Sequence, residues 1–320
     1  MRLNKKAAAC VVAAAMALSM LTACGGGGGS TGGNGSNITI PKQDEIVLPG
    51  SGEDGGEGGD TGEGGDTGSV KVPITNVQNS KTVQANNRLS GATEFYVELA
   101  EEEYDDDGAV EFAVKGTVAR KNDVIYENVS ASMGTRQQAY ERISRKEDGA
   151  WRTYTILSSE KIIVKQGSVS STSDPNFEVL GEVPAQMWST TMKVAGTVYE
   201  AETYRGHYSN DEIINCFDPD GTPRYQFTLD RDTGKITEIQ AYKAYRVGSG
   251  ASQNLCQMPR GYKEYTANRS DGVQTLTDAE GNVYTVEFKY DEDYNIESVK
   301  VTDKDGKDVS DQFTWLRKIS

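Results

Sequence analysis

The chemistry that this sequence indicates most clearly centres on Cys24, which ends the segment Leu21-Thr22-Ala23-Cys24. A basic start with Arg2, Lys5 and Lys6 and a mostly apolar run over 7–21 precede it. A basic start, a short apolar stretch and a small-residue cleavage site are typical of a secretory signal peptide. The apolar run is too short to span a bilayer comfortably as a permanent helix. We therefore predict that residues 1–23 are a signal peptide that directs export.

The L-x-A-C ending at 21–24 resembles the bacterial lipobox. The resemblance implies that Cys24 receives a thioether-linked diacylglyceryl group and becomes the first residue of a mature lipoprotein. Two acyl chains suffice for stable anchoring, whereas one chain alone is marginal. The expected location is the extracytoplasmic face of the cell membrane, with the lipid as the only membrane attachment. An ordinary signal peptide with an incidental cysteine is the alternative.

The remaining histidine and cysteines offer little catalytic chemistry. His207 is the one histidine of the chain, which removes His-based zinc sites and weakens Ser-His-Asp and Cys-His hypotheses. Cys10 would leave with the signal peptide, so Cys216 and Cys256 remain in a compartment where disulfides persist. We favour a disulfide between Cys216 and Cys256, with two buried thiols as the alternative.

Asp-Thr-Gly, the loop with which aspartic proteases pair two carboxylates, occurs at 60–62, 66–68 and 232–234. Two copies lie in a Gly-rich acidic stretch and the third follows a strand-like segment, so turn chemistry explains all three. The 303–308 segment fits a hairpin turn better than a calcium loop, since its glycine falls out of the EF-hand frame. We predict no catalytic residue, no metal site and no cofactor, and keep a carboxylate-based hydrolase as a minor alternative.

The charge balance restricts the partners. The precursor carries a net charge of −15, and removal of residues 1–23 takes away three basic residues and no acid, which leaves −18. Such a balance argues against nucleic acid and against electrostatic binding to anionic lipid. Residues 24–69 are rich in Gly and acidic residues and repeat Glu-Gly-Gly-Asp-Thr-Gly at 57–62 and 63–68. We predict a flexible linker there, because such a composition cannot bury enough apolar surface to offset backbone entropy.

Beyond residue 69 the pattern indicates antiparallel strands joined by tight turns. Apolar and polar residues alternate in short runs, and Asp-Gly-type turn signals such as those at 147–149, 218–221 and 230–234 separate the runs. The strands are expected at 94–100 paired with 110–116, and at 124–129, 138–144, 151–157, 161–165, 192–204, 212–217, 224–229, 235–246, 275–276, 283–290, 296–302 and 313–318. Short helices are expected at 76–89 and 186–192. We expect the polar stretch 248–254 to divide an antiparallel β domain at 70–250 from a small C-terminal β unit at 251–320.

Aromatic residues are the candidates for a binding surface. Trp151, Tyr154, Trp188, Tyr199 and Tyr204 lie in or next to the expected strands. Aromatics in strands usually serve core and cross-strand packing. The functional alternative is a concave sheet face on which these five side chains contact an apolar or amphipathic ligand.

The chain resembles the LolA/LppX group of envelope lipoproteins in its local sequence pattern. The similarity is clearest in the segments 94–98, 110–119, 140–154 and 215–221. The resemblance implies a curved half-barrel that holds a lipid tail or another apolar ligand on its concave face. We therefore expect an all-β, antiparallel, half-barrel-like sheet with a small C-terminal β-hairpin unit after a disordered linker. The expected function is non-enzymatic binding of an apolar or amphipathic ligand at the cell surface. A scaffold or adhesin-like module for another envelope protein or polymer is the alternative.

Overall fold

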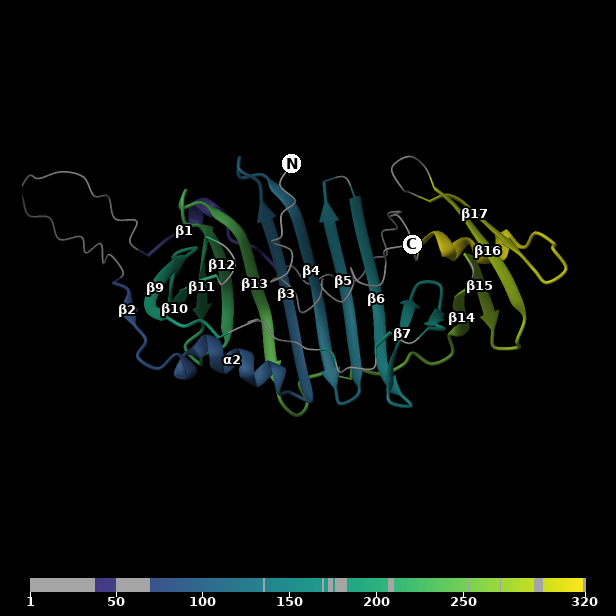
Figure 1. The fold of residues 1–320 in the computed structure, drawn as a ribbon, viewed down its shortest axis with the longest axis horizontal. Coiled ribbons are helices and arrows are strands. Elements are labelled where there is room, and N and C mark those ends of the chain that lie inside the picture. Colours follow the sequence, from purple (N-terminus) through teal and green to yellow (C-terminus); the bar gives the residue numbers. More distant parts are fainter. Residues whose placement is uncertain are drawn as a thin grey trace, which may run out of the picture.

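The computed structural model describes residues 38–49 and 70–318, with short gaps at 135, 169, 172–174, 176–182, 207–209, 253, 271 and 291–295. Cys24, the expected signal peptide, most of the expected linker and His207 lie outside the described residues. Among the residues described, no helix is long and apolar enough to cross a bilayer. The expected all-β class is confirmed (Figure 1).

The elements follow one another as a series of hairpins. The strands are β1 (Ile46–Val47), β2 (Val72–Pro73), β3 (Glu94–Tyr104), β4 (Val110–Lys121), β5 (Val124–Met133), β6 (Arg136–Glu147), β7 (Ala150–Leu157), β8 (Ile162–Gln166), β9 (Met187–Val194), β10 (Thr197–Arg205), β11 (Asp211–Phe217), β12 (Pro223–Asp230), β13 (Ile236–Val247), β14 (Lys263–Ser270), β15 (Val273–Asp278), β16 (Val283–Tyr290) and β17 (Ile296–Thr302). The helices are the 3-10 turns η1 (Gln43–Glu45) and η2 (Val77–Asn79), the α-helix α2 (Lys81–Ser90) and the 3-10 segment η3 (Ser310–Lys318).

The strands form one large curved sheet in the order β9-β10-β11-β12-β13-β3-β4-β5-β6-β7-β8-β14-β15-β16-β17. The short strands β1 and β2 both pair with β9 and complete that end of the sheet. All pairs are antiparallel except β8–β14, which is parallel. A parallel pair needs a long connection, and here the chain between β8 and β14 runs through β9–β13 and ends in residues 248–262, which we call the crossover.

One turn chemistry recurs at the hairpins. In the loops that start at Asp105, Asp278 and Asp303, the carboxylate accepts backbone N–H groups two and four residues later. A glycine with positive φ follows three residues after each of these aspartates. Asp230 likewise accepts the N–H groups of residues 232 and 233. These bonds confirm the turn interpretation of the 232–234 Asp-Thr-Gly copy and of the 303–308 segment.

The two faces of the sheet are covered by different segments. We call the face that carries Val97 and Leu99 the helix face, because α2 packs on it through Leu89. The opposite face, with Tyr96 and Tyr126, is called the loop face. Leu255, Cys256, Met258 and Tyr262 of the crossover pack on the loop face between β4 and β8. The crossover is held by Ser252, whose hydroxyl donates to the Glu94 carboxylate at 2.7 Å.

Residues 38–49 correct the linker prediction. Ile40, Ile46 and Leu48 pack on the loop face against a cluster from β9 to β13, and β1 pairs with Val194 and Lys193 of β9. These apolar residues of a polar segment are half-buried here because the edge of β9 offers unpaired backbone groups and an apolar face. The flexible linker predicted for 24–69 is therefore interrupted by a docked segment.

Three secondary-structure predictions are also wrong. The segment 186–192, expected to be a helix, forms strand β9. The segment 192–204, expected to be a single strand, contains the end of β9 and the strand β10. A turn at Ala195 and Gly196, with φ of 47° and 82°, joins these two strands. Positive φ at both positions is the type I′ hairpin geometry, which Ala-Gly signals weakly. The strand expected at 313–318 is part of η3, whose Phe313, Trp315 and Leu316 fill the core of the C-terminal strands. The helix expected at 76–89 is present as η2 and α2.

The C-terminal strands continue the main sheet. Register along β8 and β14 joins Lys263 to Ile162 and Ala267 to Gln166. Leu157, Ile162 and Val164 of the main sheet share one apolar cluster with the C-terminal strands and η3. The unit at 251–320 is thus packed and hydrogen-bonded to the rest of the fold.

Candidate functional site

The five aromatics expected to contact a ligand do not form one surface. Trp151 is buried on the helix face with Val97 and Leu99, whereas Tyr154 is buried on the loop face with Tyr126. Both lie in β7 at an odd spacing, and successive side chains of a strand point to opposite faces. The prediction that these residues line one concave face is therefore wrong for this pair.

Two of the other three aromatics are also engaged in packing. Tyr204 is buried against Val83 of α2 and Met187. Tyr199 is half-buried and makes an edge-on contact with Tyr225, with ring centroids 5.5 Å apart. Trp188 is half-buried at the β9–β2 pairing. Four of the five side chains accordingly serve the core or its margin.

The two cysteines are separate thiols, which corrects the disulfide prediction. Cys216 on β11 is buried, and its thiol contacts the sulfur of Met192 at 3.7 Å. The thiol of Cys256 in the crossover donates to the carbonyl of Ala119 on β4 at 3.5 Å. The order β11-β12-β13-β3-β4 places four inter-strand steps between the two sites, or roughly 19 Å at the usual spacing. A disulfide needs Cα atoms within about 7 Å.

A cluster of charged side chains at the β6–β7 hairpin is the most developed polar site of the described residues. Asp148 and Gly149 form the turn with φ of 51° and 80°, a type I′ geometry that places Glu147 opposite Ala150. The same register places Arg145 directly opposite Arg152. Like charges directly opposite one another destabilise a sheet, so the pair must be balanced by a neighbouring group.

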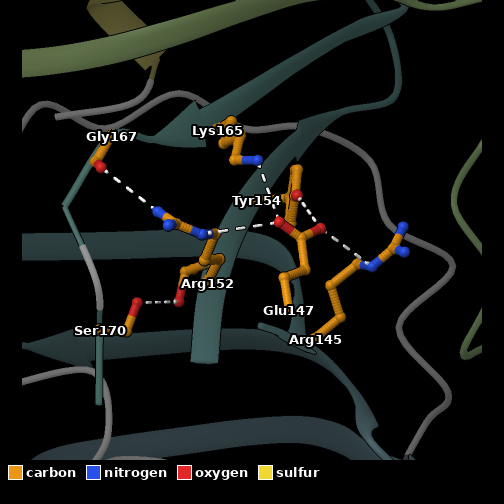
Figure 2. A network of polar contacts seen from close by, with 8 residues as sticks. Arg145, Glu147, Arg152, Tyr154, Lys165, Gly167 and Ser170 are labelled. Carbon is orange, nitrogen blue, oxygen red and sulfur yellow. Dashed lines mark hydrogen bonds and ion pairs between the residues drawn. The ribbon is translucent and has the colours of Figure 1, made fainter. Parts of the chain in front are cut away.

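Glu147 is that group, and Figure 2 shows four side chains that converge on its carboxylate. Lys165 Nζ lies 3.0 Å from Oε2, and Arg152 Nε lies 3.6 Å from the same oxygen. Arg145 Nε lies 3.2 Å from Oε1, to which the Tyr154 hydroxyl also donates. Arg152 is held further by a bond of 3.4 Å from its guanidinium to the carbonyl of Gly167. The hairpin and β8 thus supply all the charged groups.

The protonation states follow from these contacts. Partial burial alone would raise the pKa of the Glu147 carboxyl, but the hydrogen bonds from Tyr154 and Lys165 and the charges of Lys165 and Arg145 together lower it. The hydrogen bond to Glu147 raises the pKa of Lys165. Burial, followed by the bond to Glu147, raises the pKa of Tyr154. At neutral pH the site therefore holds three cations, one carboxylate and a neutral phenol, for a local charge of +2.

A second polar pair lies on the helix face. Glu127 on β5 and Arg142 on β6 are opposite one another and both buried. Burial raises the pKa of Glu127 to about 7, although the charge of Arg142 acts in the other direction. The Arg142 guanidinium lies over the Tyr140 ring, 4.1 Å from its centroid. Among the described residues, Glu127 Oε1 and Arg142 Nε have no hydrogen-bond partner.

Neither polar site was identified from the sequence, although one signal was present. Once 147–149 is read as a turn, the hairpin register places Arg145 against Arg152, which is an unfavourable pairing for a purely structural hairpin. The participation of Lys165 depends on the β7–β8 pairing of Tyr154 with Lys165. For Glu127 and Arg142, alternation alone gives no sign that charged residues are buried.

Comparisons with known proteins identify no family for the chain. No protein-family model matches it, and no curated protein matches it. Among solved structures, the chain is similar to the crystal structure of an uncharacterized conserved protein from Thermus thermophilus. That similarity has a TM-score of 0.32 and 9% sequence identity, and it covers 58% of this chain and 99% of the other.

Proposed function

We propose that this chain is a lipid-anchored, non-enzymatic binding protein of the cell surface that binds another envelope component through its charged outer surface and loops. The anchor rests on the signal-like segment and Cys24. The choice of an envelope partner over a small apolar ligand rests on the packing of the sheet. Trp151, Tyr154 and Tyr204, which were expected to contact an apolar ligand, are instead buried in three different apolar clusters.

The covering segments support the same choice. Residues 38–49 and the crossover pack on the loop face, and α2 packs on the helix face. An apolar ligand on either covered region would have to displace these segments and lose the contacts they make. A protein or polymer partner requires no such displacement, since it binds the charged outer surface and the loops.

Native mass spectrometry of the full-length protein, taken from its own membranes into a mild detergent, tests this proposal. The expected mass is that of the processed chain with covalent acyl groups on Cys24. A non-covalent lipid or other apolar molecule of constant mass, retained at one per chain, would overturn the proposal in favour of a ligand carrier.

A further inference from the structure

We propose that Arg145, Arg152 and Lys165 form a binding site for a phosphate group and that Glu147 positions these three cations. The inference rests on the proposed role as an envelope binding protein, for which it names the chemistry of the partner. The phosphate group belongs either to a soluble phosphate monoester or to a lipid headgroup that ends in a phosphate monoester.

The cluster has more positive than negative charge, which is the first reason to expect a bound anion. One carboxylate needs one cation for neutrality, yet three surround Glu147 within 3.6 Å. The excess is concentrated at one hairpin of a chain whose net charge is −15. Placing Arg145 against Arg152 costs stability, and the single carboxylate of Glu147 balances only part of the positive charge around it. Binding of an anion would offset the repulsion that the hairpin register creates.

The positions of the hydrogen-bond donors on the two arginines and the lysine are the second reason. Arg145 contacts Glu147 through Nε, and its terminal amino groups point away from the carboxylate in Figure 2. The side chains of Arg145, Lys165 and Arg152 are 45%, 34% and 25% exposed, so all three side chains are accessible from solvent. The guanidinium fork matches two oxygens of a phosphate, and a lysine adds a point charge.

The size of the local charge favours phosphate over a carboxylate. A phosphate monoester carries a charge of about −1.5 to −2 at neutral pH and three acceptor oxygens. The cluster offers a charge of +2 from three donors, whereas a single carboxylate would leave one cation unmatched. Nucleic acid is disfavoured because its closely spaced phosphates would meet the acidic remainder of the surface.

Titration of the full-length protein in detergent tests the site, with isotope-labelled Arg and Lys side chains observed by NMR. One arm uses inorganic phosphate and glycerol 3-phosphate, and the other uses vesicles that contain phosphatidic acid, whose headgroup is a phosphate monoester. We expect saturable shifts of the Arg145, Arg152 and Lys165 signals in at least one arm, and the arm that binds more tightly identifies the source of the phosphate. R145Q and R152Q should each weaken binding roughly tenfold or more.

The control is K289Q, which removes an exposed lysine that pairs with Glu297 at 2.6 Å on the β16–β17 hairpin. It should bind phosphate as the parent does. Arg145 is the more exposed of the two arginines, so R145Q keeps the test valid if R152Q unfolds the hairpin. Absence of saturable shifts in both arms, or equal binding by R145Q and K289Q, would overturn the inference. Either result leaves the native-mass test of the proposed function unaffected.

Discussion

Glu202 caps the start of α2 from a strand far away in the sequence, and its Oε2 accepts the backbone N–H of Thr82 at 2.8 Å. The other carboxylate oxygen accepts the N–H of Lys81, also at 2.8 Å. The first N–H groups of a helix have no partner within the helix, and a negative charge is favourable there. Glu202 lies on the helix face of β10 and is buried, so one carboxylate joins the helix to the sheet.

Glu202→Gln should destabilise the protein by about 1–3 kcal/mol, because one N–H loses its acceptor and the helix loses the compensating charge. The matched control is Glu200→Gln, two residues along the same strand, where the side chain is 68% exposed and pairs with Lys81. We expect that control to cost less than about 1 kcal/mol. Urea unfolding monitored by tryptophan fluorescence measures both, and equal losses would contradict the assigned cap.

Gly116→Ala should destabilise the centre of the sheet. A Cβ at this position would lie 2.7 Å from the carbonyl oxygen of Asn128 and 2.9 Å from Val129 Cγ2. Neither neighbour is a flexible side-chain end, so β4 and β5 must move apart, at a cost of about 1–3 kcal/mol. Lys115→Ala, on the exposed neighbouring residue, is the control and should change the free energy of unfolding much less. A Gly116→Ala protein as stable as this control would show that the pair tolerates a side chain there.

Glu127→Gln should change the pH dependence of stability. Burial raises the pKa of Glu127 to about 7 in the folded protein, compared with about 4.3 when unfolded. Between these values the folded state binds more protons than the unfolded state, so the contribution of Glu127 to stability falls as pH rises. The free energy of unfolding of Glu127→Gln minus that of the parent should therefore increase from pH 4.5 to pH 7 and then level off. Urea unfolding across this range measures it, and a flat or falling difference would refute the assignment.

The two thiols should remain separate and react slowly. Burial raises the pKa of Cys216 to about 12 and that of Cys256 to about 11, and the thiolate is the reactive form. In the folded protein at pH 8 we expect Cys256, which is less buried, to be alkylated before Cys216. After unfolding without reductant, peptide mass spectrometry should find each cysteine alkylated. A cross-linked peptide that contains both cysteines would contradict this prediction and show that the disulfide forms.

Cys24→Ala should abolish lipid anchoring. We expect the variant to be released from membranes or to remain there as the uncleaved precursor, because the acceptor of the diacylglyceryl group is gone. Cys10→Ala, within the expected signal peptide, is the control and should mature and partition into detergent as the parent does. Unchanged processing and detergent partitioning of Cys24→Ala would reject the anchor.

Local turns were predictable because their chemistry lies within a few residues. Asp303 and Gly306, for example, form a turn from their own side-chain and backbone preferences, and the strands on both sides follow from alternation. Turn position also sets register, so the Arg145–Arg152 pairing could be read from the sequence once the turn at 148–149 is known. The antiparallel β class and most strand positions therefore follow from local turn chemistry and from the alternation of apolar and polar residues.

The long-range pairings depended on tertiary structure. β13 joins β3 across about 140 residues of sequence, as the bond from Gln240 to Glu101 illustrates, and no turn links the two strands. β8 joins β14 in parallel through a crossover, and residues 38–49 dock on β9. These contacts form because each strand edge and each apolar face must be covered, a condition that many alternative arrangements of the same hairpins would satisfy.

The sequence by itself therefore determined the class of fold, its turns and the signal-like segment that ends at Cys24, since each depends on neighbouring residues. Tertiary structure alone decided which groups from different hairpins meet. It separated Cys216 from Cys256 by the width of several strands, buried Trp151 and Tyr154 on opposite faces, and brought Lys165 to the carboxylate of Glu147. The physical reason is that strand order is set by burial of whole faces, and strand order fixes every distance across the sheet.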